Sequence, residues 1–275
     1  MKSFSVLTSV YYKEKPEYLK AALDSIFSQS LLPNEVVLVK DGPLGDELEA
    51  VIDESIKKHA ETSFVVVELG QNVGLGEALN KGLERVSSEY VMRVDTDDIS
   101  LPNRFDRQMR FLDAHPEVSI LGSNIDEYDE DMLRKLSVRE VPQSHDEIVN
   151  FMKGRNAFNH MAVVFKKSAI IRVGQYQPCP FFEDYYLWLR VLSAGGKFHN
   201  IQESLVRARA GSSMISRRGG FSYISNIIAF YIKVRRLKIM PDSQILKSCL
   251  GRSAVAIMPN SLRASIYRRR LRSRF

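Results

Sequence analysis

Three aspartates stand close together in the segment MRVDTDDISLP, residues 92–102: Asp95, Asp97 and Asp98. Carboxylates two residues apart in an extended or turning backbone can point toward one hard cation. Mg²⁺ or Mn²⁺ takes one or two carboxylates together with phosphate oxygens. A metal that bridges to a diphosphate would also relieve the repulsion between the three acids. The segment therefore predicts a site for Mn²⁺ or Mg²⁺.

The same acids could instead mark the beginning of a helix. Asp98 or Ser100 would then cap a helix after Pro102, where the helix dipole also favours negative charge. A calcium loop of the EF-hand type does not fit, because its sixth and twelfth positions require Gly and Glu. Those positions are Ser100 and Asp106 here. A metal site and a capped helix start both stay open at this point.

The acids follow the fourth of a series of apolar runs that alternate with helical patterns. Runs such as FSVLTSV and EVVLV indicate buried strands, and Leu19, Leu23 and Ile26 recur at helical spacing after Pro16. Alternation of this kind is typical of an α/β fold with a mainly parallel sheet and helices on both faces. We expect strands at 4–10, 35–39, 63–69 and 90–94, and helices at 16–29, 46–60 and 75–86.

Polar residues follow each of the four expected strands. Tyr11 follows the first strand, Asp41 the second, Asn72 and Gly74 the third, and the three aspartates follow the fourth. Sheets of this type bind ligands beyond the carboxyl ends of their strands. The sequence therefore places four polar strand ends at one rim, where a ligand would bind.

Composition limits the class of protein. With 275 residues, 44% of them hydrophobic, the chain is long enough for one substantial core. Its two cysteines, Cys179 and Cys249, form no C-x-x-C pair and suggest no disulfide framework, so we expect a cytosolic location. We expect neither a signal sequence nor a membrane span, because no apolar run approaches roughly 18 residues.

The net charge of +6 is unevenly distributed. From Arg217 onward there are 14 lysines and arginines but one acid, Asp242, so the preceding residues are acidic overall. Residues 221–237 place apolar side chains at helical spacing, and SLRASIYRRRLRSRF continues as a basic amphipathic helix. Such helices can lie on anionic lipid headgroups. The alternatives are a helix packed on the domain with its basic face in water, or an oligomer interface.

Five motifs occur in the order and spacing of the family 2 glycosyltransferases: SVLTSVYY, VVLVKDG, NVGLGEALNKGLE, RVDTDD and FFEDYYLWLRV. The chain resembles this family over residues 3–210, which implies a catalytic domain of the GT-A fold. It is most similar to the non-processive bacterial enzymes that build O-antigen, capsule or exopolysaccharide repeat units. The Q-x-x-R-W signature of the processive synthases is absent.

The resemblance also implies a division of the chain. The GT-A domain would cover residues 1–210, with a nucleotide-sugar half over 1–100 and an acceptor half over 101–210. The Gly- and Ser-rich residues 211–220 would be a loop that closes on the donor, or an ordinary linker. A basic amphipathic helical segment would then occupy residues 221–275.

The resemblance implies a nucleotide-sugar site at the rim. Ser9 and Tyr11 would line the nucleoside pocket. Asp41 would accept a hydrogen bond from the uracil N–H, which makes a UDP-sugar the expected donor; the alternative is a turn residue before Gly42. The residues expected to bind the nucleotide sugar are Ser9, Tyr11, Asp41, Asn72, Gly74, Asp95 and Arg209.

Within the acidic segment, the resemblance implies a division of roles. Asp97, the last residue of the D-x-D motif, is expected to bind Mn²⁺ or Mg²⁺ directly. Asp95 would contact the ribose or the sugar and complete the metal site. Asp98 would assist through water, or cap the following helix.

A transferase also needs a base to remove the proton of the acceptor hydroxyl. In related enzymes the Asp of the E-D pair is the proposed base, so we expect Asp184 to act as the base and Glu183 to orient it or contact the acceptor. As an alternative, both acids could simply favour the helix N-terminus that they open. His160 would touch the acceptor or the diphosphate, or else be a satisfied, half-buried histidine.

The resemblance implies an inverting transfer of a hexose, with galactose slightly ahead of glucose, from a UDP-sugar. The acceptor would be a hydroxyl of a lipid-linked (undecaprenyl-diphosphate) saccharide at the inner face of the cell membrane. Two other functions stay open: a non-catalytic sugar- or nucleotide-binding scaffold, and a nucleic-acid binder that uses the basic tail. The acidic body and the absence of a recognition fold argue against nucleic acid.

Overall fold

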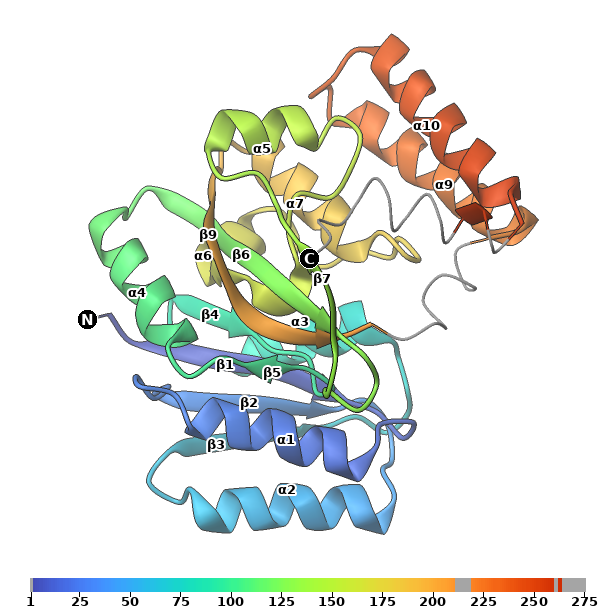
Figure 1. The fold of residues 1–275 in the computed structure, drawn as a ribbon. Helices are drawn as coiled ribbons and strands as arrows, with labels where there is room; N and C mark the ends of the chain where they lie inside the picture. The colour runs from blue at the N-terminus through green and yellow to red at the C-terminus, as the bar shows by residue number, and fades with distance from the viewer. Residues whose placement is uncertain (1, 211–218, 260–261, 264–275) are drawn as a thin grey trace.

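The computed structural model describes residues 2–210, 219–259 and 262–263 (Figure 1). Its first half alternates strands and helices, as the apolar pattern predicts. Every element expected in this half forms, and each end lies within two residues of its expected position. The elements are β1 (Phe4–Val10), α1 (Pro16–Phe27), β2 (Glu35–Lys40), α2 (Asp46–Lys58), β3 (Ser63–Glu68), α3 (Leu75–Arg85) and β4 (Tyr90–Arg93).

The strands of the described residues form one sheet. Its order is β3-β2-β1-β4-β8-β6-β9-β5, with β7 paired to β6. From β3 to β4 all pairs are parallel, β8 is antiparallel to both β4 and β6, and β6 is parallel to β9. The four parallel strands therefore end at one rim. The remaining strands are β5 (Ile99–Ser100), β6 (Val118–Tyr128), β7 (Lys135–Arg139), β8 (Val164–Lys166) and β9 (Lys197–Arg209).

Helices cover both faces of the sheet, as Figure 1 shows. Alternation along β1 separates the two cores. Val6 packs with Leu19 of α1 on one face, and Leu7 packs with Leu79 of α3 on the other. The first face also carries α4 (Arg104–Ala114). The second face carries α6 (Lys167–Arg172) and α7 (Glu183–Ser193), and the short elements α5 (His145–Phe151) and η1 (His160–Ala162) complete this half.

The helix that follows the three aspartates begins later than a capping role for them would require. α4 begins at Arg104, and Asn103 occupies its N-cap position. Ser100 lies in β5, because it pairs with Val206 of β9. Asp98 comes before that strand. The interpretation of Asp98 or Ser100 as the cap of this helix is therefore wrong, and the acids need another explanation.

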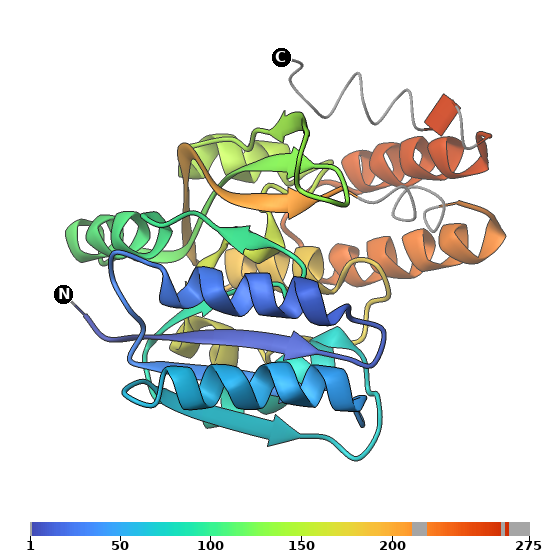
Figure 2. The same ribbon diagram turned by 60° about the horizontal axis from the view of Figure 1, so that its bottom comes forward.

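Two helices, α9 (Phe221–Arg236) and α10 (Asp242–Ile257), lie side by side at one end of the molecule (Figure 2). The expected helix over 221–237 thus forms, and α9 packs on the domain, where Phe230 stacks on Phe182 at a centroid distance of 4.6 Å. Within the described ranges no helix is long and apolar enough to span a bilayer. Residues 211–218 of the expected loop and most of the last expected helix lie outside the described residues.

Candidate active site

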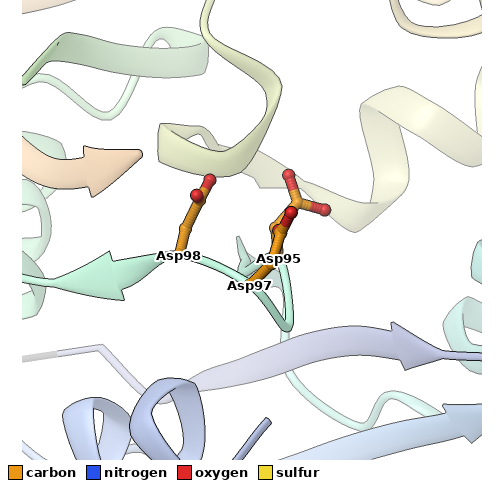
Figure 3. A group of neighbouring side chains, drawn as sticks. All are labelled: Asp95, Asp97 and Asp98. Atoms are coloured by element: carbon orange, nitrogen blue, oxygen red, sulfur yellow. The ribbon is translucent and has the colours of Figure 1, made fainter. Parts of the chain in front are cut away.

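The three aspartates leave β4 in a tight turn, residues 95–98, which we call the acid loop (Figure 3). One carboxylate oxygen from each of Asp95, Asp97 and Asp98 lies within 4.8 Å of the other two. Asp98 is buried, and the other two are half-buried. Three hard oxygens this close together fit a divalent cation of the Mg²⁺ or Mn²⁺ type.

The three acids differ in pKa because they lie close together and are partly buried. Burial and the charges of Asp95 and Glu14 raise the pKa of Asp97 to about 7. Burial and the charges of its two neighbours raise the pKa of Asp98 well above its usual value. Burial opposes ionisation of Asp95 as well, but the Arg93 guanidinium holds its pKa below the usual value. Without a cation the loop therefore keeps protons that a cation would displace.

Two buried arginines lie next to the acid loop. Arg93 at the end of β4 is fully buried and donates from Nη2 to Asp95 Oδ1. Arg104 of α4 is equally buried and donates from Nη2 to the backbone oxygen of Arg93 at 2.7 Å. Burial, followed by the charge of Arg93, lowers the pKa of Arg104 to about 9. Desolvated cations are costly, so their position beside the acids indicates a built anionic centre.

Arg209, at the end of β9, forms hydrogen bonds with the acid loop. Its backbone N–H donates to Asp98 Oδ1 at 2.9 Å, and its Nε donates to the backbone oxygen of Asp97 at 2.7 Å. The guanidinium also lies over the ring of Tyr18, 3.8 Å from the centroid. Arg209 thus lies at the expected site, where its contacts fix the shape of the acid loop.

The second and third strand ends meet through Asp41. This aspartate is 3% exposed, and its carboxylate accepts hydrogen bonds from Asn72 Nδ2 at 3.0 Å, Val73 N at 2.7 Å and Gly74 N at 3.1 Å. Gly42 has a φ of +90°, and a Cβ there would lie 2.7 Å from Asn72 N. The approach of these two loops therefore requires glycine.

The first strand end supplies the open part of this rim. Ser9 is the next-to-last residue of β1 and is half-buried. Tyr11 follows the strand, and 41% of its surface is exposed. Asp41 N donates to Val10 O at 2.8 Å, so the first and second strand ends adjoin. The structure therefore brings the expected residues Ser9, Tyr11, Asp41, Asn72 and Gly74 to neighbouring strand ends.

The E-D pair opens α7, as the sequence predicts. Asp184 Oδ2 accepts a hydrogen bond from Asn156 Nδ2 at 2.7 Å, and its Oδ1 accepts one from Tyr185 N at 2.7 Å. Burial raises the pKa of Glu183. The Glu183 Cγ would lie 3.7 Å from a Cβ on Gly76, in the first turn of α3. The start of α7 therefore faces the start of the helix that follows the third strand.

His160 and Tyr176 stand between these two acidic centres. Their Nε2 and Oη atoms are 2.7 Å apart. Arg93, Asp184 and Asp95 all influence the charge of the His160 ring. His160 is half-buried and its Nε2 is hydrogen-bonded, whereas no described residue bonds its Nδ1.

Residues 5–174 match the model of the family described as Glycosyl transferase family 2. This match runs from β1 to the turn after α6 and includes the acid loop. The chain belongs to glycosyl transferase family 2. The expected family is therefore confirmed, and a glycosyltransferase is confirmed as the class of enzyme.

Two relatives match this glycosyltransferase over most of its length. The chain is 43% identical over 236 residues to the amylovoran biosynthesis glycosyltransferase AmsE of Erwinia amylovora, covering 86% of this chain and 85% of the relative. It is 36% identical over 269 residues to an Escherichia coli UDP-Gal:alpha-D-GlcNAc-diphosphoundecaprenol beta-1,3-galactosyltransferase, covering 98% of this chain and 96% of the relative.

Solved structures share the fold of this glycosyltransferase. A structure of residues 1–349 of S. aureus TarS in complex with UDP-GlcNAc aligns with a TM-score of 0.69 at 18% identity, over 96% of this chain and 75% of that fragment. The mannosyltransferase PcManGT of Pyrobaculum calidifontis, in complex with GDP-Man and Mn²⁺, aligns with a TM-score of 0.64 at 15% identity, over 96% of this chain and 79% of its own. The expected GT-A fold is confirmed.

Three side chains that contact the expected site residues are given no role by the sequence analysis. Arg93 carried one signal, because it begins the motif RVDTDD as a cation that ends a buried apolar strand directly before the acids. Asn156 and Tyr176 carried none, because they reach the site from irregular segments between short elements. Only the folded chain brings Asn156 to Asp184 and Tyr176 to His160.

Proposed function

We propose that this glycosyltransferase moves a hexose from a UDP-sugar to a hydroxyl of a lipid-linked saccharide in bacterial surface polysaccharide assembly. One observation carries the proposal: Asp95 of the acid loop and Asp184 both lie near enough to the His160–Tyr176 pair to influence its charge. A diphosphate leaving group and an acceptor base must stand on opposite sides of the reacting carbon in an in-line displacement.

The acid loop is proposed to hold Mn²⁺ or Mg²⁺. Asp97 would be the direct ligand, with Asp98 and the free oxygen of Asp95 beside it. When bound, the cation would neutralise charge that builds on the departing diphosphate. Arg93 and Arg209 keep the acids in place, because each is already hydrogen-bonded to the loop.

At the donor end, Ser9, Tyr11 and Asn72 are proposed to border the nucleoside. Asp41 is proposed to have two roles. Its three hydrogen bonds hold the turn before Gly74, and its carboxylate would also accept a hydrogen bond from the uracil N–H. The name of the E. coli relative and the UDP-GlcNAc held by TarS both support a UDP-sugar.

Asp184 is proposed as the base. Hydrogen bonds from Asn156 and from Tyr185 N hold one oxygen each, which fixes the direction of the carboxylate. The base would take the proton of the acceptor hydroxyl while that oxygen attacks the anomeric carbon, with inversion of configuration. Glu183 lies beside it and would orient the acceptor.

The described C-terminal helices are proposed to rest on an anionic membrane surface at the cytoplasmic face, where a lipid-linked acceptor would be found. Leu246 and Leu250 of α10 are each 60% exposed, and Ile232 of α9 is 53% exposed. Basic side chains such as Arg236 and Lys247 are exposed beside them. Apolar side chains with a cationic border suit lipid headgroups. The lipid-linked acceptor named for the E. coli relative supports this position.

The direct test is transfer. Purified chain, Mn²⁺ and UDP-galactose or UDP-glucose would be incubated with GlcNAc-diphosphoundecaprenol or a short-chain analogue, and the lipid product weighed by mass spectrometry. A product heavier by one hexose is expected. A folded chain that binds UDP but yields no product with any donor and acceptor of the panel would favour the scaffold function instead.

A further inference from the structure

A polar pair lies between the acid loop and the start of α7, and the proposed chemistry does not yet use it. His160 Nε2 and Tyr176 Oη are 2.7 Å apart. η1, which His160 begins, leads directly to Val163, whose backbone oxygen accepts a hydrogen bond from Arg93 N at 3.0 Å. The histidine is thus anchored next to the end of β4, where the acid loop begins.

Tyr176 is the fixed member of the pair. Its backbone N–H donates to Asn80 Oδ1 at 2.9 Å, and its backbone oxygen accepts from Asn80 Nδ2 at 2.9 Å. A Cβ on Gly76 would lie 3.4 Å from the Tyr176 Cβ, so the first turn of α3 packs directly against it. Tyr176 is only 5% exposed. Because the tyrosine is held on the buried side, it fixes one ring nitrogen of His160.

The other ring nitrogen of His160 is the available one. His160 is half-buried, unlike its partner. Among the described residues, the hydrogen bond of its ring is the one from Nε2 to Tyr176, and Nδ1 has no partner there. A ligand that lies between the acid loop and Asp184 would therefore meet Nδ1 as a fixed polar group.

The charge of the ring decides which ligand it suits. Burial, followed by the positive charge of Arg93, lowers the pKa of His160 to about 4, against the opposite influence of Asp184 and Asp95. The imidazole is therefore neutral near pH 7. A neutral imidazole offers one donor and one acceptor, which suits a hydroxyl group, whereas a diphosphate calls for a cation.

We propose that His160 hydrogen-bonds a hydroxyl of the transferred sugar, and that Tyr176 is the positioning residue that fixes its tautomer, so that the pair selects the hexose. This inference rests on the proposed function, because the sugar must lie between the acid loop and Asp184. Epimeric sugars differ in the direction of one hydroxyl group. A histidine ring in a fixed position can hydrogen-bond that hydroxyl in only one of the two epimers.

The test compares binding of UDP, UDP-galactose, UDP-glucose and UDP-N-acetylglucosamine by calorimetry with Mn²⁺. Wild type, His160→Ala and Tyr176→Phe would be measured, with His199→Ala as the control. His199 stacks on Phe111 at a centroid distance of 4.4 Å and contacts no residue of the proposed site in the described structure. Thermal unfolding of each variant monitors the fold.

We expect wild type to prefer one sugar nucleotide. In His160→Ala this preference should fall roughly five- to tenfold, the value of one hydrogen bond, while the affinity for UDP stays within about twofold. Tyr176→Phe should cause a smaller loss in the same direction, and the control none. An unchanged sugar preference in His160→Ala, or an equal loss of UDP affinity, would overturn the inference. If wild type bound none of the four nucleotides, the proposed function itself would fall.

Discussion

Asn156 Nδ2 lies 2.7 Å from Asp184 Oδ2, a contact between an irregular segment and the second residue of α7. Tyr185 N occupies the other carboxylate oxygen at 2.7 Å. Both oxygens of the acid thus accept a hydrogen bond from the protein itself. An acid at a helix start commonly accepts from the free N–H groups of the first turn, as Asp184 does from Tyr185 N, but the bond from Asn156 comes from another segment and favours a positioned base.

Asp184→Asn should lower kcat about 10²- to 10⁴-fold, because the amide cannot accept the acceptor proton. UDP affinity should stay unchanged, since the nucleotide end of the site is not altered. Asn156→Ala should cost roughly tenfold in kcat through loss of one orienting hydrogen bond. Asp53→Asn, on the exposed side of α2, is the control. Unimpaired turnover in Asp184→Asn would remove this residue from the mechanism.

Mn²⁺ affinity should depend on pH around the pKa of Asp97, which is about 7. Below that pH the carboxyl holds a proton that the cation must displace, so affinity should fall as pH falls, by up to about tenfold per pH unit for each proton released. Calorimetry in buffers of different ionisation enthalpy would count those protons. An affinity that does not change from about pH 8 to about pH 6 would contradict this assignment.

The same raised pKa has a consequence for the metal-free protein. The folded state binds the proton of Asp97 more tightly than the unfolded state does, so this group lowers the free energy of unfolding as pH rises from about 4 to about 7. Metal-free Asp97→Asn should therefore unfold at a higher temperature than wild type at about pH 8, and the gap should shrink at about pH 5. Scanning calorimetry measures both. A difference in unfolding temperature that grows toward low pH would contradict a raised pKa of Asp97.

Gly42→Ala should destabilise the chain by about 2 kcal/mol, because of its left-handed backbone and because the added Cβ would approach Asn72 N to 2.7 Å. UDP binding should weaken as well, since the Asp41 turn would shift. Gly45→Ala is the matched control: nothing lies within 4 Å of its Cβ, and its φ is −82°. Urea unfolding and UDP titration of the two variants would check this. Equal stability in both would contradict the close approach of the two loops.

Leu246→Glu combined with Leu250→Glu should abolish sedimentation with vesicles that contain phosphatidylglycerol, because both side chains are 60% exposed on α10. Leu133, which is 86% exposed in the turn between β6 and β7, supplies the control Leu133→Glu. Sedimentation of the double variant with the vesicles at the wild-type level would contradict the membrane surface. Loss of a dimer in place of vesicle binding would favour the oligomer interface.

The nucleotide half of the fold could be predicted because its signals are local. Strand β2 is a continuous apolar run, and each parallel strand ends in a polar turn, so the rim follows from the sequence alone. The position of α4 could not be predicted in the same way. Pairing of Ser100 with Val206, over a hundred residues away, delays the helix, and such pairing leaves no signal near Pro102.

The structure of the acceptor half is harder to predict from the sequence, because its strands also pair with distant segments. β6 pairs with β7, β8 and β9, and the register of β9 against β6 shifts three times. The buried charge of Arg93 has its counterion, Asp95, only in the folded chain. In α9, Ile228 and Ile232 are exposed while Ile227 and Phe230 are buried, because a helix that is apolar on several sides does not reveal from its sequence which side faces the core.

Every role proposed above depends on the acid loop binding a divalent cation together with a uridine nucleotide. Calorimetry of UDP, GDP and TDP with Mn²⁺, repeated after chelation and with Asp97→Ala, tests it most directly. We expect tight binding of UDP in preference to GDP and TDP, and we expect it to be lost on chelation and in Asp97→Ala while the variant stays folded. Nucleotide binding that is equally strong without metal and in the variant would contradict it.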